Sequence, residues 1–212
     1  MKIKSVRLSM FFICLVILLQ VSSGCSASPQ KAAPLEVGAG MFTMQEATGA
    51  NANDLNVFYY CPAGWTPDKP VVLVQHGFQR NAQEYRDGWI KFAEQYDLLV
   101  ICPEFSEGKY PGVRYYNTGN ISDRDDEPGR LQPKDKWVFP VIQHVIREVK
   151  LRFGAIGNFT LFGHSAGAQF VHRYMFFSDE AQVSQIIVAN AGWYILCRIQ
   201  ILIFLMGSKT CH

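Results

Sequence analysis

The sequence predicts an α/β fold in which a mostly parallel sheet is flanked by helices. Short apolar runs of strand length alternate along the chain with segments whose apolar residues recur at helical spacing. Several runs are continuously apolar, as in strands that are buried on both faces. With 49% hydrophobic and 18% charged residues among 212, the composition is that of a folded domain with one sizeable core.

The elements follow one another in a regular order. The segment VVLVQHG is a continuous apolar run, and AQEYRDGWIKFAEQY carries its apolar residues on one helical face. In WVFPVIQHVIREVKLRF, Pro140 is expected in the first turn of a helix, where proline is tolerated. Strands are expected at 55–62, 71–77, 98–105, 158–163 and 184–192, and helices at 82–96, 137–153 and 166–177.

Residues 1–25 are expected to be a signal peptide. Lys2, Lys4 and Arg7 precede the apolar run 8–19, which is too short to cross a bilayer comfortably, and small residues follow. VSSGC resembles a bacterial lipoprotein cleavage site with Cys25 as the lipidated residue, although a serine stands where leucine is usual; the alternative is ordinary cleavage a little farther on. The protein is therefore expected to be exported, as a periplasmic, lipid-anchored or secreted protein.

The rest of the chain divides into three parts. Residues 26–50 are expected to be a linker and N-terminal edge, 51–194 a partial domain, and 195–212 an aberrant apolar tail. Removal of the signal peptide changes 20 basic against 18 acidic residues to 17 against 18. A nearly neutral mature chain lacks the basic surface that nucleic-acid binding requires, so a membrane is expected as a partner only through the signal peptide or a lipid anchor.

The cysteines show no evident disulfide framework. Cys14 lies in the signal peptide, and Cys197 and Cys211 lie in the tail. Cys61 and Cys102 fall at the ends of expected strands, where they either pair with each other or remain buried thiols. No C-x-x-C pair is present, and neither a metal nor a cofactor is expected.

An acidic stretch lies in the long irregular segment 106–135. Its carboxylates lack the spacing of a calcium loop, so a solvated loop paired with Arg124 and Arg130 is the favoured interpretation. The carboxylates are those of Asp123, Asp125, Asp126 and Glu127. Aromatic residues of the same segment either line a substrate cleft or cover the edge of the sheet; they are Tyr110, Tyr115 and Tyr116.

The motif GHSAG, residues 163–167, is the main functional signal. A G-x-S-x-G motif between an apolar strand and a helix predicts a nucleophile elbow that exposes the hydroxyl of Ser165 above the sheet. Gly163 and Gly167 flank the turn, where side chains would clash with neighbouring elements. The helix that begins here directs free N–H groups toward an incoming oxyanion.

A second signal, QHGFQRN, follows the strand at 71–77. An oxyanion hole needs the N–H after the nucleophile, here Ala166, and an N–H from this loop. Phe78 is the expected second donor, with Gln79 as the alternative, and such donors are worth roughly 3–4 kcal/mol of barrier each. His76 is expected to brace the loop rather than accept the serine proton.

With these motifs the chain resembles the α/β-hydrolase superfamily, and within it bacterial esterases related to polyhydroxybutyrate depolymerases. The similarity covers about 55–194 and includes VVLVQHGFQRNAQEY, YDLLVICPEF, YPGVRYYNTGN and FTLFGHSAGAQFVHRY. The resemblance implies hydrolysis of a small ester or polyester through an acyl-enzyme. It also implies a triad in the chain order serine, acid, histidine, with the last two on loops after later strands.

The sequence identifies no triad acid or base. His172 lies seven residues along the helix from Ser165, about 10 Å away along the axis, whereas a base must approach within about 3 Å. His144 is expected to be structural, and Asp179 and Glu180 are expected to be solvated or capping charges.

The segment ILCRIQILIFLMGSKTCH, 195–212, loses the alternation of strands and helices. It suggests a shifted reading frame or an early stop, so the fold is expected to lack its C-terminal strands and to leave residues 186–189 as an exposed edge. The terminal His212 is not expected to be the base.

Two functions follow from these expectations. One is a serine ester hydrolase by ancestry, impaired as written; the other is a non-catalytic hydrolase-like binding module or an unstable remnant. The oligomeric state is left open.

Overall fold

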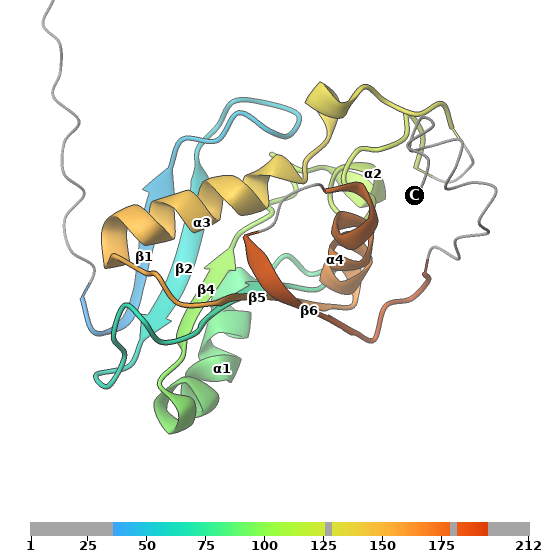
Figure 1. The fold of residues 1–212 in the computed structure, drawn as a ribbon. Coiled ribbons are helices and arrows are strands. Elements are labelled where there is room, and N and C mark those ends of the chain that lie inside the picture. Colours follow the sequence, from blue (N-terminus) through green and yellow to red (C-terminus); the bar gives the residue numbers. More distant parts are fainter. Residues whose placement is uncertain (1–35, 126–128, 179–181, 195–212) are drawn as a thin grey trace, which may run out of the picture. The chain divides into compact units, whose positions relative to one another are not determined.

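The computed structural model describes residues 36–125, 129–178 and 182–194 (Figure 1). Within these residues the strands are β1 (Gly38–Met44), β2 (Leu55–Cys61), β3 (Val71–Gln75), β4 (Leu99–Pro103), β5 (Phe159–His164) and β6 (Val183–Ala189). The helices are α1 (Ala82–Tyr96), α2 (Gly112–Tyr115), α3 (Pro140–Phe153) and α4 (Ala166–Phe177), with a 3₁₀ turn η1 (Lys134–Lys136).

Several sequence expectations fall outside the described residues. They are the signal peptide with Cys14 and Cys25, the carboxylates of Asp126 and Glu127, those of Asp179 and Glu180, and the tail with Cys197, Cys211 and His212. Among the described residues, the helices are too short or too polar to cross a bilayer.

The strands form one sheet in the order β1-β2-β4-β3-β5-β6. The β3–β4, β3–β5 and β5–β6 pairs are parallel, and β1–β2 and β2–β4 are antiparallel. The predicted α/β class with a mostly parallel sheet is therefore confirmed. Strand β1 lies inside the segment 26–50 that the sequence suggested as linker and N-terminal edge, and it extends the sheet back to Gly38.

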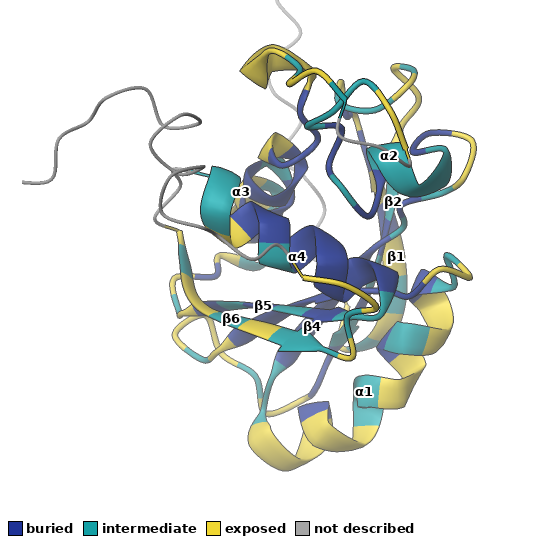
Figure 2. Ribbon diagram, turned by 90° about the vertical axis from the view of Figure 1, so that its right-hand side faces the viewer, coloured by how far each residue is buried: buried dark blue, intermediate teal, exposed yellow. Residues whose placement is uncertain are grey.

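Helices cover both faces of the sheet, with α1 on one side and α3 and α4 on the other (Figures 1 and 2). Alternate residues of β3 therefore enter different cores: Val72 and Val74 pack with Ala93 of α1, whereas Val71 and Leu73 join the larger core that includes α3 and α4. Burial on both faces explains why this strand is a continuous apolar run, as predicted.

Helix α3 contributes one apolar stripe to the larger core. Its first residue is Pro140, as expected, and Gly154 ends it in the left-handed conformation at φ 70°. The buried apolar side chains of the stripe are Val141, Ile142, Val145, Ile146 and Val149.

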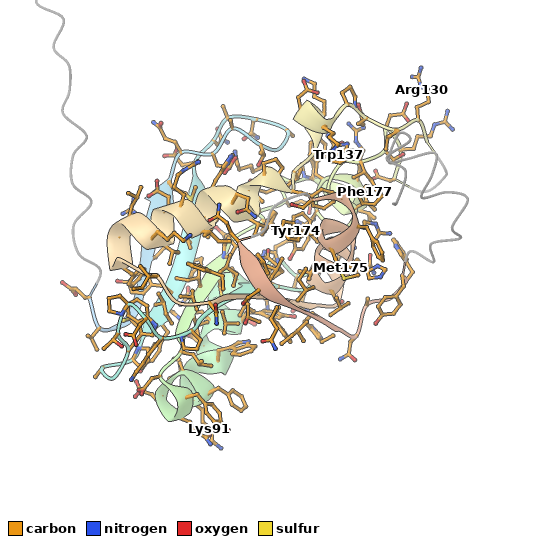
Figure 3. All side chains as sticks on the ribbon, in the orientation of Figure 1. Lys91, Arg130, Trp137, Tyr174, Met175 and Phe177 are labelled. Carbon is orange, nitrogen blue, oxygen red and sulfur yellow. The ribbon has the colours of Figure 1, made fainter. Side chains whose placement is uncertain are left out.

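Aromatic side chains connect α4 to the segment before α3 (Figure 3). The Trp137 ring meets Phe177 edge-on, with centroids 5.6 Å apart, and Tyr174 accepts a hydrogen bond at 2.5 Å from the buried amide of Gln143. Aromatic pairs of this geometry add about 0.5–1.5 kcal/mol beyond the area that they bury. The far end of α4 is thereby fixed against the rest of the domain.

Cys61 and Cys102 are buried free thiols. The β2–β4 register places Phe58 opposite Cys102, so Cys61 lies three residues farther along the neighbouring strand. The two side chains also enter different cores, on opposite faces of the sheet. Of the two alternatives that the sequence left open, the buried thiols are therefore correct.

Strand β6 ends the sheet within the described residues. It pairs only with β5, and none of its side chains is fully buried. Ile187 is 42% exposed. The expected open edge at residues 186–189 is thus present in the described part of the chain.

Candidate active site

Ser165 occupies a strained turn between β5 and α4. Its backbone lies at φ 54° and ψ −115°. This conformation costs a non-glycine residue free energy, and it persists only where the surrounding structure imposes it. Two hydrogen bonds hold it: the Ser165 N–H donates to the Ala189 carbonyl at 3.0 Å, and the Gln169 N–H donates to the Ser165 carbonyl at 3.2 Å. The strand-to-helix turn predicted from GHSAG is present.

The two glycines of the motif allow main-chain segments to touch. A Cβ on Gly163 would lie 2.4 Å from the Gly167 carbonyl oxygen, and a Cβ on Gly167 would lie 2.4 Å from the Gln75 carbonyl oxygen. Neither neighbour is a flexible side chain, so any larger residue would displace the start of α4. The elbow therefore rests directly on the end of β3.

The loop after β3 forms a tight turn beside the nucleophile. The Arg80 N–H donates to the Gly77 carbonyl at 3.2 Å, which places Phe78 and Gln79 at the centre of the turn. A Cβ on Gly77 would lie 3.7 Å from the Ser165 Cβ. Among the described residues, the main-chain N–H groups of Phe78, Gln79 and Ala166 have no protein acceptor.

His76 braces this turn, as the sequence suggested. Its Nε2 accepts the Phe105 N–H at 2.9 Å, so the ring proton lies on Nδ1, which donates to the Gly77 carbonyl at 3.0 Å. Burial lowers the pKa of His76 to about 4, because the charged imidazolium would be desolvated. A neutral imidazole whose Nε2 is already occupied is not available to take a proton from Ser165.

Arg80, which sequence reasoning missed, holds the far side of the turn. Its guanidinium donates to the Phe105 carbonyl at 2.7 Å and to the Gly112 carbonyl at 3.0 Å, and it lies 4.3 Å from the centre of the Tyr116 ring. An ion pair at 3.1 Å to Glu107 compensates the partly buried charge. The arginine thus connects the turn to the long segment after β4.

Two solved structures share this arrangement of elements at substantial identity. A poly(3-hydroxybutyrate) depolymerase from Bordetella parapertussis is 36% identical, with a TM-score of 0.68 over 76% of this chain and 54% of that one. A poly(aspartic acid) hydrolase from Sphingomonas sp. KT-1 is also 36% identical, with a TM-score of 0.69 over 78% of this chain and 61% of that one. The chain belongs to the α/β-hydrolase superfamily.

More distant similarity shows the fold alone. An acetyl xylan esterase from Aspergillus awamori is 17% identical, with a TM-score of 0.52 over 74% of this chain and 55% of that one. No protein-family model matches the sequence, and no curated protein is significantly similar to it. The chain spans little more than half the length of the two solved hydrolases that are 36% identical to it. Its similarity to them shows that its ancestry is that of a hydrolase.

The other described histidines of this α/β-hydrolase chain make contacts of their own. The Nδ1 of His144 lies 2.8 Å from the buried carboxylate of Glu46, a contact that fits the structural role expected for this histidine. His172 packs edge-on against Phe176 and Tyr194, with ring centroids 5.1 Å away in each case. In the described part of the chain, the Ser165 hydroxyl has no hydrogen-bond partner.

Polar groups next to the elbow form a second cluster that the sequence did not indicate. Asn117 donates to the Gln169 side chain at 2.9 Å, and Arg173 donates to the Gln169 carbonyl at 3.0 Å. All three residues are buried, and burial lowers the pKa of Arg173 to about 10. The sequence gave no signal for the contact between Asn117 and Gln169, since it joins segments that are distant in the chain.

The tyrosines of the long segment have mainly structural roles. Tyr110 and Tyr116 are fully buried in the core, so they do not line a cleft, whereas Tyr115 is half-buried under the Arg114 guanidinium. Tyr116 donates to the His76 carbonyl at 2.6 Å.

The acidic loop pairs internally, as expected. Arg130 donates to the Asp123 carboxylate through its backbone N–H at 2.8 Å and its side chain at 3.1 Å. Asp125 accepts the backbone N–H of Arg114. Across the described residues, no group of three or more metal-ligating side chains is found.

Proposed function

We propose that this chain provides the nucleophile and the oxyanion hole of a serine ester hydrolase. The observation that carries the proposal is the approach of two segments: the elbow at Ser165 packs on the turn after β3, and free N–H groups of Phe78 and Ala166 belong to these two segments. Preorganised N–H groups at such a position stabilise the negative charge of a tetrahedral intermediate.

The proposed chemistry follows from these groups. The Ser165 Oγ forms a bond to the ester carbonyl carbon while its proton passes to a general base, and the carbonyl oxygen becomes an oxyanion between the N–H groups of Phe78 and Ala166. The bond to the alcohol oxygen then breaks, and the alcohol leaves with the proton from the base. Water repeats the sequence on the acyl-enzyme and releases the carboxylic acid.

The solved hydrolases support the substrate class. Of the two that are 36% identical, one carries the name of a poly(3-hydroxybutyrate) depolymerase, and that polymer is a polyester. The other carries the name of a poly(aspartic acid) hydrolase, whose polymer is joined by amide bonds, so the ester class rests on the first. We therefore propose a small ester or a polyester as the substrate.

A non-catalytic hydrolase-like binding module is the second candidate. The observation in its favour is that the Ser165 hydroxyl has no hydrogen-bonded base among the described residues, whereas a serine needs one for activation. This module would keep the elbow and the turn as a scaffold only.

Reaction with a fluorophosphonate probe and hydrolysis of a short-chain aryl ester separate the two candidates. The hydrolase predicts stoichiometric labelling that is lost in Ser165→Ala and kept in Ser184→Ala, a serine whose hydroxyl instead bonds the Phe159 carbonyl in the sheet. Absence of any labelling that depends on Ser165, in a sample that is folded by circular dichroism, would refute the hydrolase and support the binding module.

Export is proposed from residues 1–25, which combine a basic flank with an apolar run. Metabolic labelling with a fatty acid tests the lipid anchor: label that disappears in Cys25→Ser supports it. An unlabelled chain that is processed and released in soluble form would instead indicate ordinary cleavage.

A further inference from the structure

A single tyrosine hydroxyl connects the two segments that carry the proposed oxyanion donors. The hydroxyl of Tyr85, in the first turn of α1, lies 2.6 Å from the Nδ1 of His164. The main chain of Gly77 packs against the same hydroxyl, since a Cβ on Gly77 would lie 2.8 Å from it. Gly77 directly precedes Phe78, and His164 directly precedes Ser165, so the hydroxyl touches one of these residues and bonds the other.

The direction of this bond depends on the tautomer of the histidine. A tyrosine hydroxyl can donate to a ring nitrogen that carries no proton, so Tyr85 donates to Nδ1 when the ring proton of His164 lies on Nε2. The hydroxyl thereby joins helix α1 to the residue before the nucleophile.

Little space is free around this hydroxyl. A Cβ on Gly77 would lie 2.8 Å from it and 3.7 Å from the Ser165 Cβ, so only a glycine fits between the tyrosine and the nucleophile. A main-chain hydrogen bond also links the loop to the elbow, from the Gly167 N–H to the His76 carbonyl at 3.0 Å. That bond fixes the loop before Gly77, whereas the tyrosine contacts it next to Phe78.

We infer that Tyr85 is a positioning residue of the oxyanion hole, which holds the Phe78 N–H at the correct separation from the Ala166 N–H. This inference rests on the proposed function. Catalytic groups must be held to within about 0.5 Å of their productive positions, and donors on two separate segments meet that condition only if the segments are connected. Tyr85 touches neither the substrate nor Ser165 Oγ in this role; it acts through Gly77 and His164.

The test replaces Tyr85 by phenylalanine, which keeps the ring and removes only the hydroxyl. The matched control is Tyr96→Phe on the same helix, where the tyrosine is 59% exposed and its hydroxyl accepts from the neighbouring Gln95. For ester hydrolysis we expect Tyr85→Phe to lower kcat about 10- to 100-fold with little change in KM, which is less than the loss of a whole oxyanion donor. Tyr96→Phe should leave both constants unchanged.

A second measurement does not require activity. Amide hydrogen exchange at Gly167, whose N–H donates to the His76 carbonyl between the elbow and the loop, should accelerate up to about tenfold in Tyr85→Phe, because the two segments lose their connection through the tyrosine. The ¹⁵N signal of His164 Nδ1 should also shift. Exchange and ¹⁵N signals that match the wild type would overturn the inference. A chain without any reaction at Ser165 would refute the proposed function, while the exchange data would still decide the role of Tyr85.

A variant on the other side of the bond guards against misfolding. If Tyr85→Phe does not fold, His164→Phe removes the acceptor and leaves the tyrosine in place. Faster exchange is expected in this variant at Ser165 and Gly167, whose N–H groups donate to the Ala189 and His76 carbonyls, and unchanged exchange would contradict the inference.

Discussion

His76 makes the folding free energy of the chain depend on pH, and this dependence can be worked out from its environment. The imidazole is fully buried between the turn and the core, and burial lowers its pKa from 6.5 to about 4. The nearby Arg80 charge acts in the same direction. In the unfolded chain the same imidazole takes up a proton near its ordinary pKa. The folded state therefore binds fewer protons than the unfolded state throughout the interval between the two values.

The sign and size of the effect follow by linkage. Stability rises with pH wherever the unfolded state binds more protons, so the contribution of His76 is complete above pH 6.5 and is lost as the pH falls toward 4. The difference between 6.5 and about 4 corresponds to roughly 3 kcal/mol, since one pKa unit is worth about 1.4 kcal/mol. This is a large part of the roughly 5–15 kcal/mol that stabilises a typical domain.

Urea unfolding followed by circular dichroism between pH 5 and 7 measures this contribution with little interference from carboxylates. We expect the unfolding free energy of the wild type to fall as the pH is lowered from 7 to 5. In His76→Gln, whose amide can still accept the Phe105 N–H but does not titrate, the slope should be much flatter. Burial also lowers the pKa of His172, which is only partly buried. The slope of His172→Gln therefore serves as the comparison with that of His76→Gln. Equal slopes in the wild type and His76→Gln would refute the reasoning.

Three further predictions concern packing. Gly167→Ala should destabilise the fold by about 1–3 kcal/mol or more, because the new Cβ would meet the main chain at 2.4 Å. Gly88→Ala in α1, which has open space around it, should stabilise the fold by about 0.5–1 kcal/mol. Thermal unfolding of both variants checks this pair of predictions. His144→Ala should lower the free energy of unfolding in urea by about 2 kcal/mol, since the buried Glu46 carboxylate loses its hydrogen-bond partner, and His144→Gln should recover part of the loss. The contact with His144 lowers the pKa of Glu46, so the stability that the carboxylate contributes is present above pH 4.5 and is lost on further acidification. A His144→Ala variant whose stability in acid matches that of the wild type would contradict this. Ile187→Lys should reduce aggregation in light scattering, because a charge on the open edge strand opposes pairing with another chain; unaltered scattering would show that β6 is not the surface responsible.

Periodicity was sufficient to predict most of the elements. The helix expected at 82–96 is α1, and the helix expected to end near residue 177 is α4, because their apolar residues repeat at a spacing that only a helix can bury on one side. Strand β1 was harder to identify: GAGMFTM buries only Phe42 and Met44, and its glycines are typical of loops. A half-exposed edge strand has no continuous apolar run by which it can be recognised.

The candidate site was predictable to the extent that its function depends on the main chain. The elbow and the turn are defined by glycines, whose positions in the motif can be read directly from the sequence. The roles of Tyr85 and Arg80 depend on hydroxyl and guanidinium contacts with segments distant in the chain, so no local pattern indicates them. Tyr116 illustrates the same limit, since its burial in the core depends on how the whole segment 106–135 folds back.

The two described thiols have a practical consequence for handling the protein. Cys61 and Cys102 are buried under opposite faces of the sheet, and burial raises the pKa of both, so little reactive thiolate is present at neutral pH. The folded domain therefore gains no cross-link between them from an oxidising environment and loses none in a reducing one. A chain started after residue 25, where the proposed signal peptide ends, can be produced in a reducing cytosol and stored with reductant without changing these two residues.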